Sequence, residues 1–280
     1  MSAPVEPIGL IAGSGRFPIA FASKARALNL PVVCVGVRGE ASSELEPLVD
    51  QFHLVGLTRL GQMIRYFKRA GVRKVVMAGK IQKVKLNTAY FWWHYFPDWR
   101  TITFWFFRRR RDNKDDSLLL AVVDEFARDG IVCTSALDLC PELLVKAGVL
   151  TKRVPSIKEE KDIAFGWELA KEMGRLDVGQ SVAVNNRAVL AVEAIEGTDQ
   201  AILRAGTLCP CGGFTVVKVA KPQQDMRFDV PTVGCATIES MHKAGAKVLA
   251  IEADKTIVID QEETIALANR YGMTIIARAA

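Results

Sequence analysis

The chain has 280 residues, which is long enough for two ordinary domains or one large one. Half of its residues are hydrophobic and 24% are charged, a globular balance that excludes an intrinsically disordered chain. The net charge of +6 and the pI of about 9.0 favour anionic partners such as phosphate esters, nucleic acids or anionic lipids, without selecting among them.

The sequence shows no sign of export or membrane insertion. No basic segment precedes the short apolar run at residues 8–12, so we expect no signal peptide. No window approaches about eighteen uninterrupted apolar residues, the length of a membrane-spanning helix. The cysteines are scattered, and Cys34 and Cys133 fall in apolar strand-like runs. We therefore expect reduced thiols and a cytoplasmic location.

The first half of the chain alternates strands with helices. Apolar runs predict strands at residues 8–13, 31–37, 52–57, 72–78 and 131–134. Helical spacing of apolar residues predicts helices at 17–29, 60–70 and 117–128. This alternation predicts an α/β fold with a parallel sheet and right-handed crossovers, and hence a Rossmann-like domain.

The second half differs because some predicted strands follow each other without a helix. Strands are predicted at 181–184, 189–195, 214–219, 248–252, 256–259 and 274–277, and helices at 158–175, 199–205, 237–244 and 262–271. The turn at residues 185–187 should form a hairpin, and Asp199 is the expected N-cap of its helix. We predict a Rossmann-like domain at 1–135, a linker region at 136–157 and a mixed-sheet catalytic α/β domain at 158–280.

A glycine loop follows the first strand and opens the first helix. Gly13, Ser14 and Gly15 can present backbone N–H groups to an anion. The dinucleotide fingerprint G-x-G-x-x-G requires a third glycine where Pro18 stands, so a standard NAD site is not expected. A phosphate, nucleotide or sugar-phosphate contact is predicted, and the alternative is a glycine turn required only for close packing.

Lys80 follows the fourth strand and should lie at the same sheet edge as the glycine loop. Carboxyl ends of parallel strands share one crevice, so Lys80 is a natural phosphate partner, with Gln82 and Lys83 beside it. The alternative is a solvated lysine at a strand end.

Residues 90–107 are rich in aromatic side chains, and residues 108–111 are all arginine. Rings beside a basic run suit a membrane interface or a lipid-binding groove. Basic and aromatic residues also bind RNA, but here they form sequential blocks, which favours the lipid interpretation. Burial in a domain or dimer interface remains the alternative.

The polar loop between Pro222 and Pro231 interleaves both signs of charge with two amides. Prolines at both ends favour a rigid surface loop, the usual location of functional side chains. Asp225 and Asp229 could hold a divalent cation through oxygen ligands. The cations that could bind phosphate are Lys218, Lys221 and Arg227. A solvated, charged turn is the alternative.

Glu193 lies in an otherwise apolar strand, where an unpaired charge is costly. The sequence leaves two explanations open. Glu193 either pairs with Lys218 or Lys221, or binds a metal.

Four segments resemble the LpxI family, the UDP-2,3-diacylglucosamine pyrophosphatases of lipid A biosynthesis. They are IGLIAGSG at 8–15, DVGQSV at 177–182, EAIEGTD at 193–199 and KPQQDMRFDVPTVG at 221–234. The last segment is the most specific, and the aromatic block lies outside all four.

The resemblance implies a hydrolase that converts UDP-2,3-diacylglucosamine to UMP and 2,3-diacylglucosamine 1-phosphate, with the substrate between the two domains. It implies Mg2+ or another divalent cation such as Mn2+ and a protein peripheral to the inner membrane of a Gram-negative bacterium. No nucleic-acid partner is expected, and homo-oligomerisation is left open.

The expected site combines these segments. Asp225 and Asp229 would hold the metal with Glu193 or take the proton of the attacking water, and Lys218 and Arg227 complete the expected catalytic set. Expected substrate-binding residues are Gly13, Ser14, Gly15, Lys80, Gln82, Lys83, Thr198, Lys221, Gln224 and Thr232.

Two rival functions use only part of this set. A non-catalytic sugar-nucleotide or lipid carrier would need the glycine loop and the aromatic block but not Asp225. An RNA-binding protein would need the basic surface but no carboxylate loop.

Overall fold

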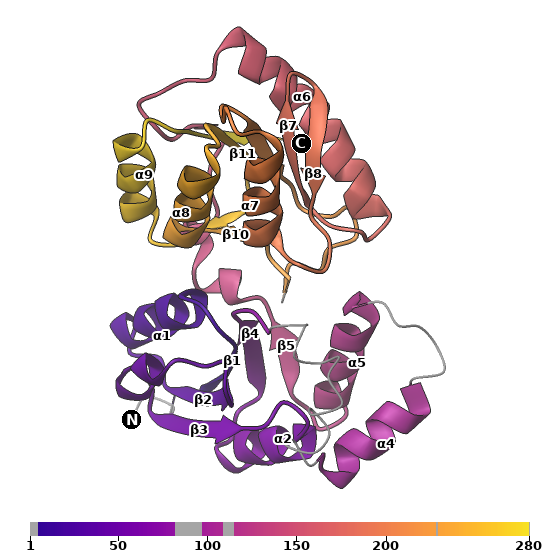
Figure 1. Ribbon diagram of the computed structural model, residues 1–280. Helices are drawn as coiled ribbons and strands as arrows, with labels where there is room; N and C mark the ends of the chain where they lie inside the picture. Colours follow the sequence, from indigo (N-terminus) through magenta and orange to yellow (C-terminus); the bar gives the residue numbers. More distant parts are fainter. Residues whose placement is uncertain (1–4, 82–96, 109–114, 228, 280) are drawn as a thin grey trace. The chain divides into compact units, whose positions relative to one another are not determined.

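The computed structural model describes residues 5–81, 97–108, 115–227 and 229–279. It divides the chain into two compact units, Met1–Pro141 and Glu142–Ala280 (Figure 1). Both units are α/β, which confirms the predicted fold class. Within the described segments, no helix is both long enough and apolar enough to span a membrane.

The first unit is built on a five-stranded parallel sheet in the order β3-β2-β1-β4-β5. The strands are β1 (Ile8–Ala12), β2 (Val32–Val37), β3 (Gln51–Val55), β4 (Lys74–Ala78) and β5 (Val132–Thr134). The helices are α1 (Phe17–Ala27), α2 (Leu60–Arg69), α4 (Trp99–Arg108) and α5 (Asp115–Ala127), with short 3-10 helices at Ser43–Leu48 and Ala136–Asp138. The predicted parallel sheet is confirmed.

The core of this unit explains why the central strands are continuously apolar. All six residues of β2 are buried, as expected for a strand covered on both faces. Phe21 of α1, Phe67 of α2 and Phe126 of α5 are fully buried. Gly9 of β1 has no room for a side chain, since a Cβ there would lie 2.5 Å from Val75 and 2.9 Å from Phe67.

The aromatic segment is described only in part. Residues 82–96, which include Gln82 and Lys83, lie outside the described residues. The helix α4 was not predicted. Its start is fixed by Asp98, which accepts the backbone N–H groups of Thr101 and of Gln62 in α2 at 2.9 Å each. Trp99 at the start of α4 is 79% exposed.

The second unit contains a six-stranded mixed sheet in the order β6-β13-β11-β9-β7-β8 and a two-stranded parallel sheet of β10 and β12. The strands are β6 (Gly148–Val149), β7 (Ser181–Asn185), β8 (Ala188–Val192), β9 (Thr215–Lys218), β10 (Thr232–Val233), β11 (Val248–Glu252), β12 (Ile257–Val258) and β13 (Thr274–Arg278). The helices are α6 (Ile157–Arg175), α7 (Thr198–Leu208), α8 (Cys235–Ala244) and α9 (Gln261–Arg270). The predicted mixed sheet is confirmed.

Helices cover both faces of this sheet. On one face, Ile163 and Ala170 of α6 pack with Val182 and Val217 of the sheet. The opposite face packs against α7, α8 and α9, which lie side by side (Figure 1). Their buried contacts include Ile202, Ile238, Met241 and Ala268. Alternate residues of each strand therefore enter different cores, as the two-residue period of a strand requires.

The strands β7 and β8 form the predicted hairpin, and its turn has two residues because Asn185 belongs to β7 and pairs with Ala188. Asn186 and Arg187 have φ angles of 53° and 58°, the left-handed values that a type I′ turn requires. The buried carboxylate of Asp162 in α6 accepts both turn N–H groups, at 3.0 Å from Asn186 and 2.6 Å from Arg187. This anchor compensates for left-handed backbone at two residues other than glycine.

Two local expectations differ from the structure. The prediction of Asp199 as N-cap is wrong, because the cap is Gly197 and Asp199 lies in the first turn of α7. Residues 136–157, treated as a linker region, contain the 3-10 helices at Ala136–Asp138 and Pro141–Leu143 and the strand β6, which pairs antiparallel with β13.

Candidate functional site

The polar residues of the second unit gather at one edge of its sheet. The parallel strands β9 and β11 end there at Lys218 and Glu252. Ser181 begins the antiparallel strand β7 opposite Lys218, and Glu193 directly follows β8. Carboxyl ends of parallel strands form the usual ligand edge of an open α/β sheet, so this edge is the candidate site.

Asp225 is held by Arg227 in the loop that follows β9. The guanidinium donates to both carboxylate oxygens, from Nε at 2.9 and 3.1 Å and from Nη2 at 2.6 Å. The Arg227 backbone N–H adds a bond of 3.0 Å. These hydrogen bonds hold the pKa of Asp225 below its usual range, although partial burial opposes ionisation. Asp225 is therefore a carboxylate near neutral pH.

The rest of the loop is anchored by Lys221. Its ammonium bonds the Asp177 carboxylate at 2.5 Å, and its backbone N–H donates to the side-chain oxygen of Gln224 at 2.8 Å. The backbone N–H of Asp229 donates to the Asp225 carbonyl at 3.0 Å. The loop thus has defined internal contacts, and Lys221 is paired with Asp177 rather than with Glu193.

A second cluster, which is largely buried, lies where this loop joins its flanking strands β9 and β10. The Lys218 ammonium donates to the Thr198 hydroxyl at 2.9 Å and to the Thr232 carbonyl at 3.2 Å. The Thr198 hydroxyl donates to Glu193 at 2.9 Å. Of the two explanations for Glu193, the structure provides a link to Lys218, through Thr198.

Glu252 at the end of β11 is an anchor of the site that was not predicted from the sequence. Its fully buried carboxylate accepts the backbone N–H of Ala220 at 2.8 Å and pairs with Lys171 at 2.6 Å and Lys255 at 2.9 Å. Burial opposes ionisation, but these donors outweigh it and hold the pKa of Glu252 below its usual range. A glutamate that ends an apolar strand was the available signal, as it was for Glu193.

The carboxylates predicted to bind metal do not form one cluster. No group of three or more histidine, cysteine, aspartate or glutamate side chains suits a metal ion in the described part of the chain. Oxygen donors of Asp225 and Asp229 fit Mg2+ in chemical type. A cation at Asp225 would have to replace Arg227, and Glu193 belongs to the separate cluster with Thr198 and Lys218.

In the first unit the structure brings the glycine loop and Lys80 together. Ser14 and Lys80 exchange backbone hydrogen bonds of 2.8 and 2.9 Å, and the Ser14 hydroxyl donates to the Lys80 carbonyl at 2.8 Å. A Cβ on Gly13 would lie 2.6 Å from that carbonyl, so close packing requires this glycine. Gly15 has a φ of 96° and open space around it, and Lys80 is exposed. Packing thus explains Gly13, and the predicted ligand contact of the loop stays a prediction.

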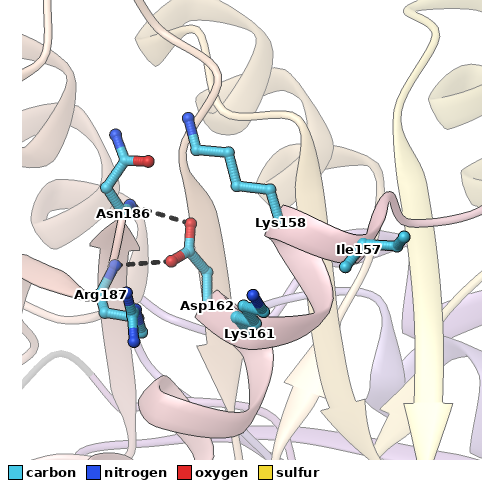
Figure 2. A pocket seen from close by; sticks show the side chains of 6 residues that line it. All are labelled: Ile157, Lys158, Lys161, Asp162, Asn186 and Arg187. Atoms are coloured by element: carbon cyan, nitrogen blue, oxygen red, sulfur yellow. Dashed lines mark hydrogen bonds between the residues drawn. The ribbon is translucent and has the colours of Figure 1, made fainter.

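A shallow hollow lies at the other end of β7 and β8, beside their turn. It is lined by Ile157, Lys158, Lys161, Asp162, Asn186 and Arg187 (Figure 2). The nearby acidic groups are engaged: Glu159 with Arg153, Glu160 with Arg278 and Asp162 with the turn. None of the predicted site residues lines this hollow.

Comparison with known proteins covers nearly the whole chain. The model of the LpxI N-terminal domain matches residues 7–143, and that of the LpxI C-terminal domain matches residues 146–276. A curated relative, UDP-2,3-diacylglucosamine pyrophosphatase LpxI of Caulobacter vibrioides, is 31% identical over 282 residues, covering 97% of each chain.

A solved structure gives a much weaker likeness. The biotin carboxylase subunit of pyruvate carboxylase is 11% identical with a TM-score of 0.28, over 69% of this chain and 39% of that one, which is too weak to carry an argument. The matches to both domain models and to the Caulobacter relative decide the family. The chain belongs to the LpxI family.

Proposed function

We propose that this protein hydrolyses the diphosphate of UDP-2,3-diacylglucosamine to give UMP and 2,3-diacylglucosamine 1-phosphate, a step of lipid A biosynthesis. The observation that carries the proposal is the full-length match to a relative whose name states this activity. The segment 221–234, which carries the most specific resemblance, supplies Asp225, Arg227 and Lys221 to the candidate edge of the second unit.

The proposed chemistry follows from the charge of the substrate. Two adjacent phosphates repel an attacking water, and fixed cations offset that repulsion as charge develops in the transition state. Arg227 can form two parallel hydrogen bonds to a phosphate, just as it does to Asp225 in this structure. Its transfer to the substrate would free the Asp225 carboxylate to orient water or accept its proton.

We also propose dependence on Mg2+ or a similar divalent cation such as Mn2+. Asp225, once released by Arg227, and Asp229 are the residues that would hold the cation, since both provide oxygen ligands. A bound cation would add positive charge at the diphosphate.

The test is incubation of the purified full-length protein with UDP-2,3-diacylglucosamine and Mg2+, with and without a chelator. The proposal expects UMP release that the chelator abolishes and added Mg2+ restores. Substrate binding without UMP release would instead indicate the alternative, a non-catalytic sugar-nucleotide or lipid carrier. UMP release that is insensitive to chelator would overturn the metal proposal alone.

A peripheral membrane association is a further part of this proposal. The net charge of +6 favours attraction to an anionic membrane surface. Trp99, whose side chain is 79% exposed, offers an aromatic ring for contact with that surface. Sedimentation with anionic vesicles should retain the wild type more strongly than a Trp99→Ser variant. Equal retention of the two proteins would remove Trp99 from the proposed contact.

A further inference from the structure

We propose that Glu193 is a positioning residue: through Thr198 it fixes the ammonium of Lys218, which closes the base of the loop that carries Asp225. The importance of that loop for catalysis rests on the proposed function, but the contacts that hold it do not.

The first step is the position of Lys218 relative to the loop. Lys218 ends β9, so its backbone forms the stem by which the chain enters the loop. Thr232 begins β10 and forms the stem by which the chain leaves it. Because the Lys218 ammonium donates to the Thr232 carbonyl at 3.2 Å, one side chain joins both stems. Asp225 and Arg227 lie between them.

Second, the Lys218 ammonium that joins the two stems also carries a positive charge in a buried position. Lys218 is only 3% exposed, and an ammonium so far removed from water requires a nearby negative charge. The Thr232 carbonyl and Thr198 hydroxyl are neutral. Glu193, itself 8% exposed, brings a negative charge to Lys218 through the Thr198 hydroxyl, which accepts from Lys218 at 2.9 Å and donates to Glu193 at 2.9 Å.

The third step is that the backbone prearranges these side chains. Ser181 is paired opposite Lys218, and its carbonyl accepts the Glu193 N–H at 2.8 Å, which places the two charged residues on either side of one strand start. Gly179 packs so tightly on the Glu193 carbonyl that no Cβ fits there. The arrangement is therefore a product of the fold of the second unit and does not depend on a bound ligand.

These contacts also change what is expected of Thr198. Its hydroxyl already donates one hydrogen bond and accepts another, so its only proton is committed to Glu193. It is better placed to connect Glu193 with Lys218 than to donate to a phosphate. The same reasoning assigns Glu193 to Lys218 and not to a metal, although its second carboxylate oxygen is buried and without a hydrogen-bond partner among the described residues.

The first arm of the test measures the loop itself, without substrate or metal. Trypsin cleavage of the full-length protein after Arg227 is followed by mass spectrometry under conditions where circular dichroism shows each variant to be folded. Thr198→Val removes the connecting hydroxyl and Glu193→Gln removes the negative charge, so each should accelerate cleavage about fivefold or more, because proteolysis tracks local opening. Thr198→Ser keeps the hydroxyl and should restore slow cleavage. Thr207→Val on the same helix is the matched control and should cleave at the wild-type rate.

The second arm measures catalysis. Where the wild type releases UMP, Glu193→Gln and Thr198→Val should lower kcat on the order of 10–100-fold, because the loop is misplaced, with a much smaller change in KM. The Mg2+ concentration that gives half-maximal activity should stay within about twofold of the wild type, since Glu193 is not a ligand.

The arms separate the possible failures. Cleavage after Arg227 at equal rates in wild type, Thr198→Val and Glu193→Gln overturns this inference. So does a Glu193→Gln variant that requires far more Mg2+ while its loop stays protected, because Glu193 would then be a ligand. A wild type that releases no UMP contradicts the proposed function, and the cleavage arm still decides the inference.

Discussion

Asp225 and Arg227 form the contact on which the proposed chemistry turns. The two side chains are two residues apart, and the guanidinium occupies both carboxylate oxygens. Because the pair lies at the surface of the loop, with side chains 23% and 40% exposed, it contributes little to the stability of the fold. In the proposed mechanism, the pair keeps a carboxylate charged and oriented until a phosphate of the substrate competes for the arginine.

Replacing Asp225 should therefore affect activity much more than folding. We expect Asp225→Ala to lower UMP release on the order of 10²–10⁴-fold, the usual loss for a missing general base or electrostatic contact. Its unfolding midpoint should stay near that of the wild type. Glu262→Ala, which removes an exposed carboxylate from α9, is the control and should keep full activity. Turnover by Asp225→Ala near the wild-type rate would exclude the residue from the mechanism.

At single residues, the sequence predicted chemical types better than partners. Lys218 and Arg227 were recognised as cations, but their observed contacts are Thr198 and Thr232 for the first and Asp225 for the second. Thr198 lies 20 positions from Lys218 along the chain, and the pairing of β7 with β9 brings them together. Such contacts arise from topology, which local patterns do not specify.

Among the elements, α6 connects to the rest of its unit through polar contacts near its N-terminus. Its N-terminus is closed by a capping box of Ser156 and Glu159, and Glu159 also binds Arg153 at 2.6 Å. One turn further, Asp162 anchors the left-handed turn between β7 and β8. The sequence predicted the helix and the hairpin separately, from apolar spacing and an Asn-Asn pair. It missed β6 and β10 because each has only two residues and lies outside a longer apolar run, whereas the equally short β12 falls within the apolar run predicted at 256–259.

Removal of the Asp162 carboxylate should destabilise the second unit. Asp162→Ala removes the charged acceptor of two partly buried backbone N–H groups at residues with φ angles of 53° and 58°, so we expect a loss of about 3 kcal/mol in unfolding free energy. Urea denaturation measures this loss. The matched control is Glu168→Ala, an exposed carboxylate on the same helix, which should change stability by less than about 0.5 kcal/mol. An equally small effect at Asp162 would show that the turn stands without its anchor.

The cap of α6 should also give a defined dependence of stability on pH. Burial of Glu159 opposes its ionisation, but hydrogen bonds from Arg153 and Ser156 prevail and hold its pKa below the usual value of 4.5. A lowered folded-state pKa means that the charged group stabilises the fold above the unfolded-state pKa, and that this stabilisation is lost as the pH falls through the folded-state pKa.

The measurement compares unfolding free energies of wild type and Glu159→Gln between pH 3 and pH 7. The difference should be constant from about pH 5.5 to 7 and shrink below about pH 4.5. A difference that is independent of pH over this range would mean that the charge of Glu159 does not contribute.

On the scale of the whole molecule, the chain consists of two units that each have a sheet and buried cores of their own. Strand periodicity predicted both kinds of sheet, because parallel strands covered on both faces are continuously apolar and the hairpin was signalled by its turn. Where the first unit ends was harder to predict, since the punctuating prolines and glycines near residues 141–155 occur within short structured segments, β6 among them.

The division into units leads to a final prediction about fragments 1–141 and 142–280. Each should fold alone with a cooperative unfolding transition, because each encloses its own core. Neither should release UMP alone at the full-length rate. The loop with Asp225 belongs to the second fragment, whereas Gly15 and Lys80 belong to the first. The measurement is UMP release by each folded fragment, separately and mixed, against the intact chain. Full activity of 142–280 alone would show that the glycine loop serves only the packing of Gly13 against Lys80, which is the role that its close backbone contact already requires.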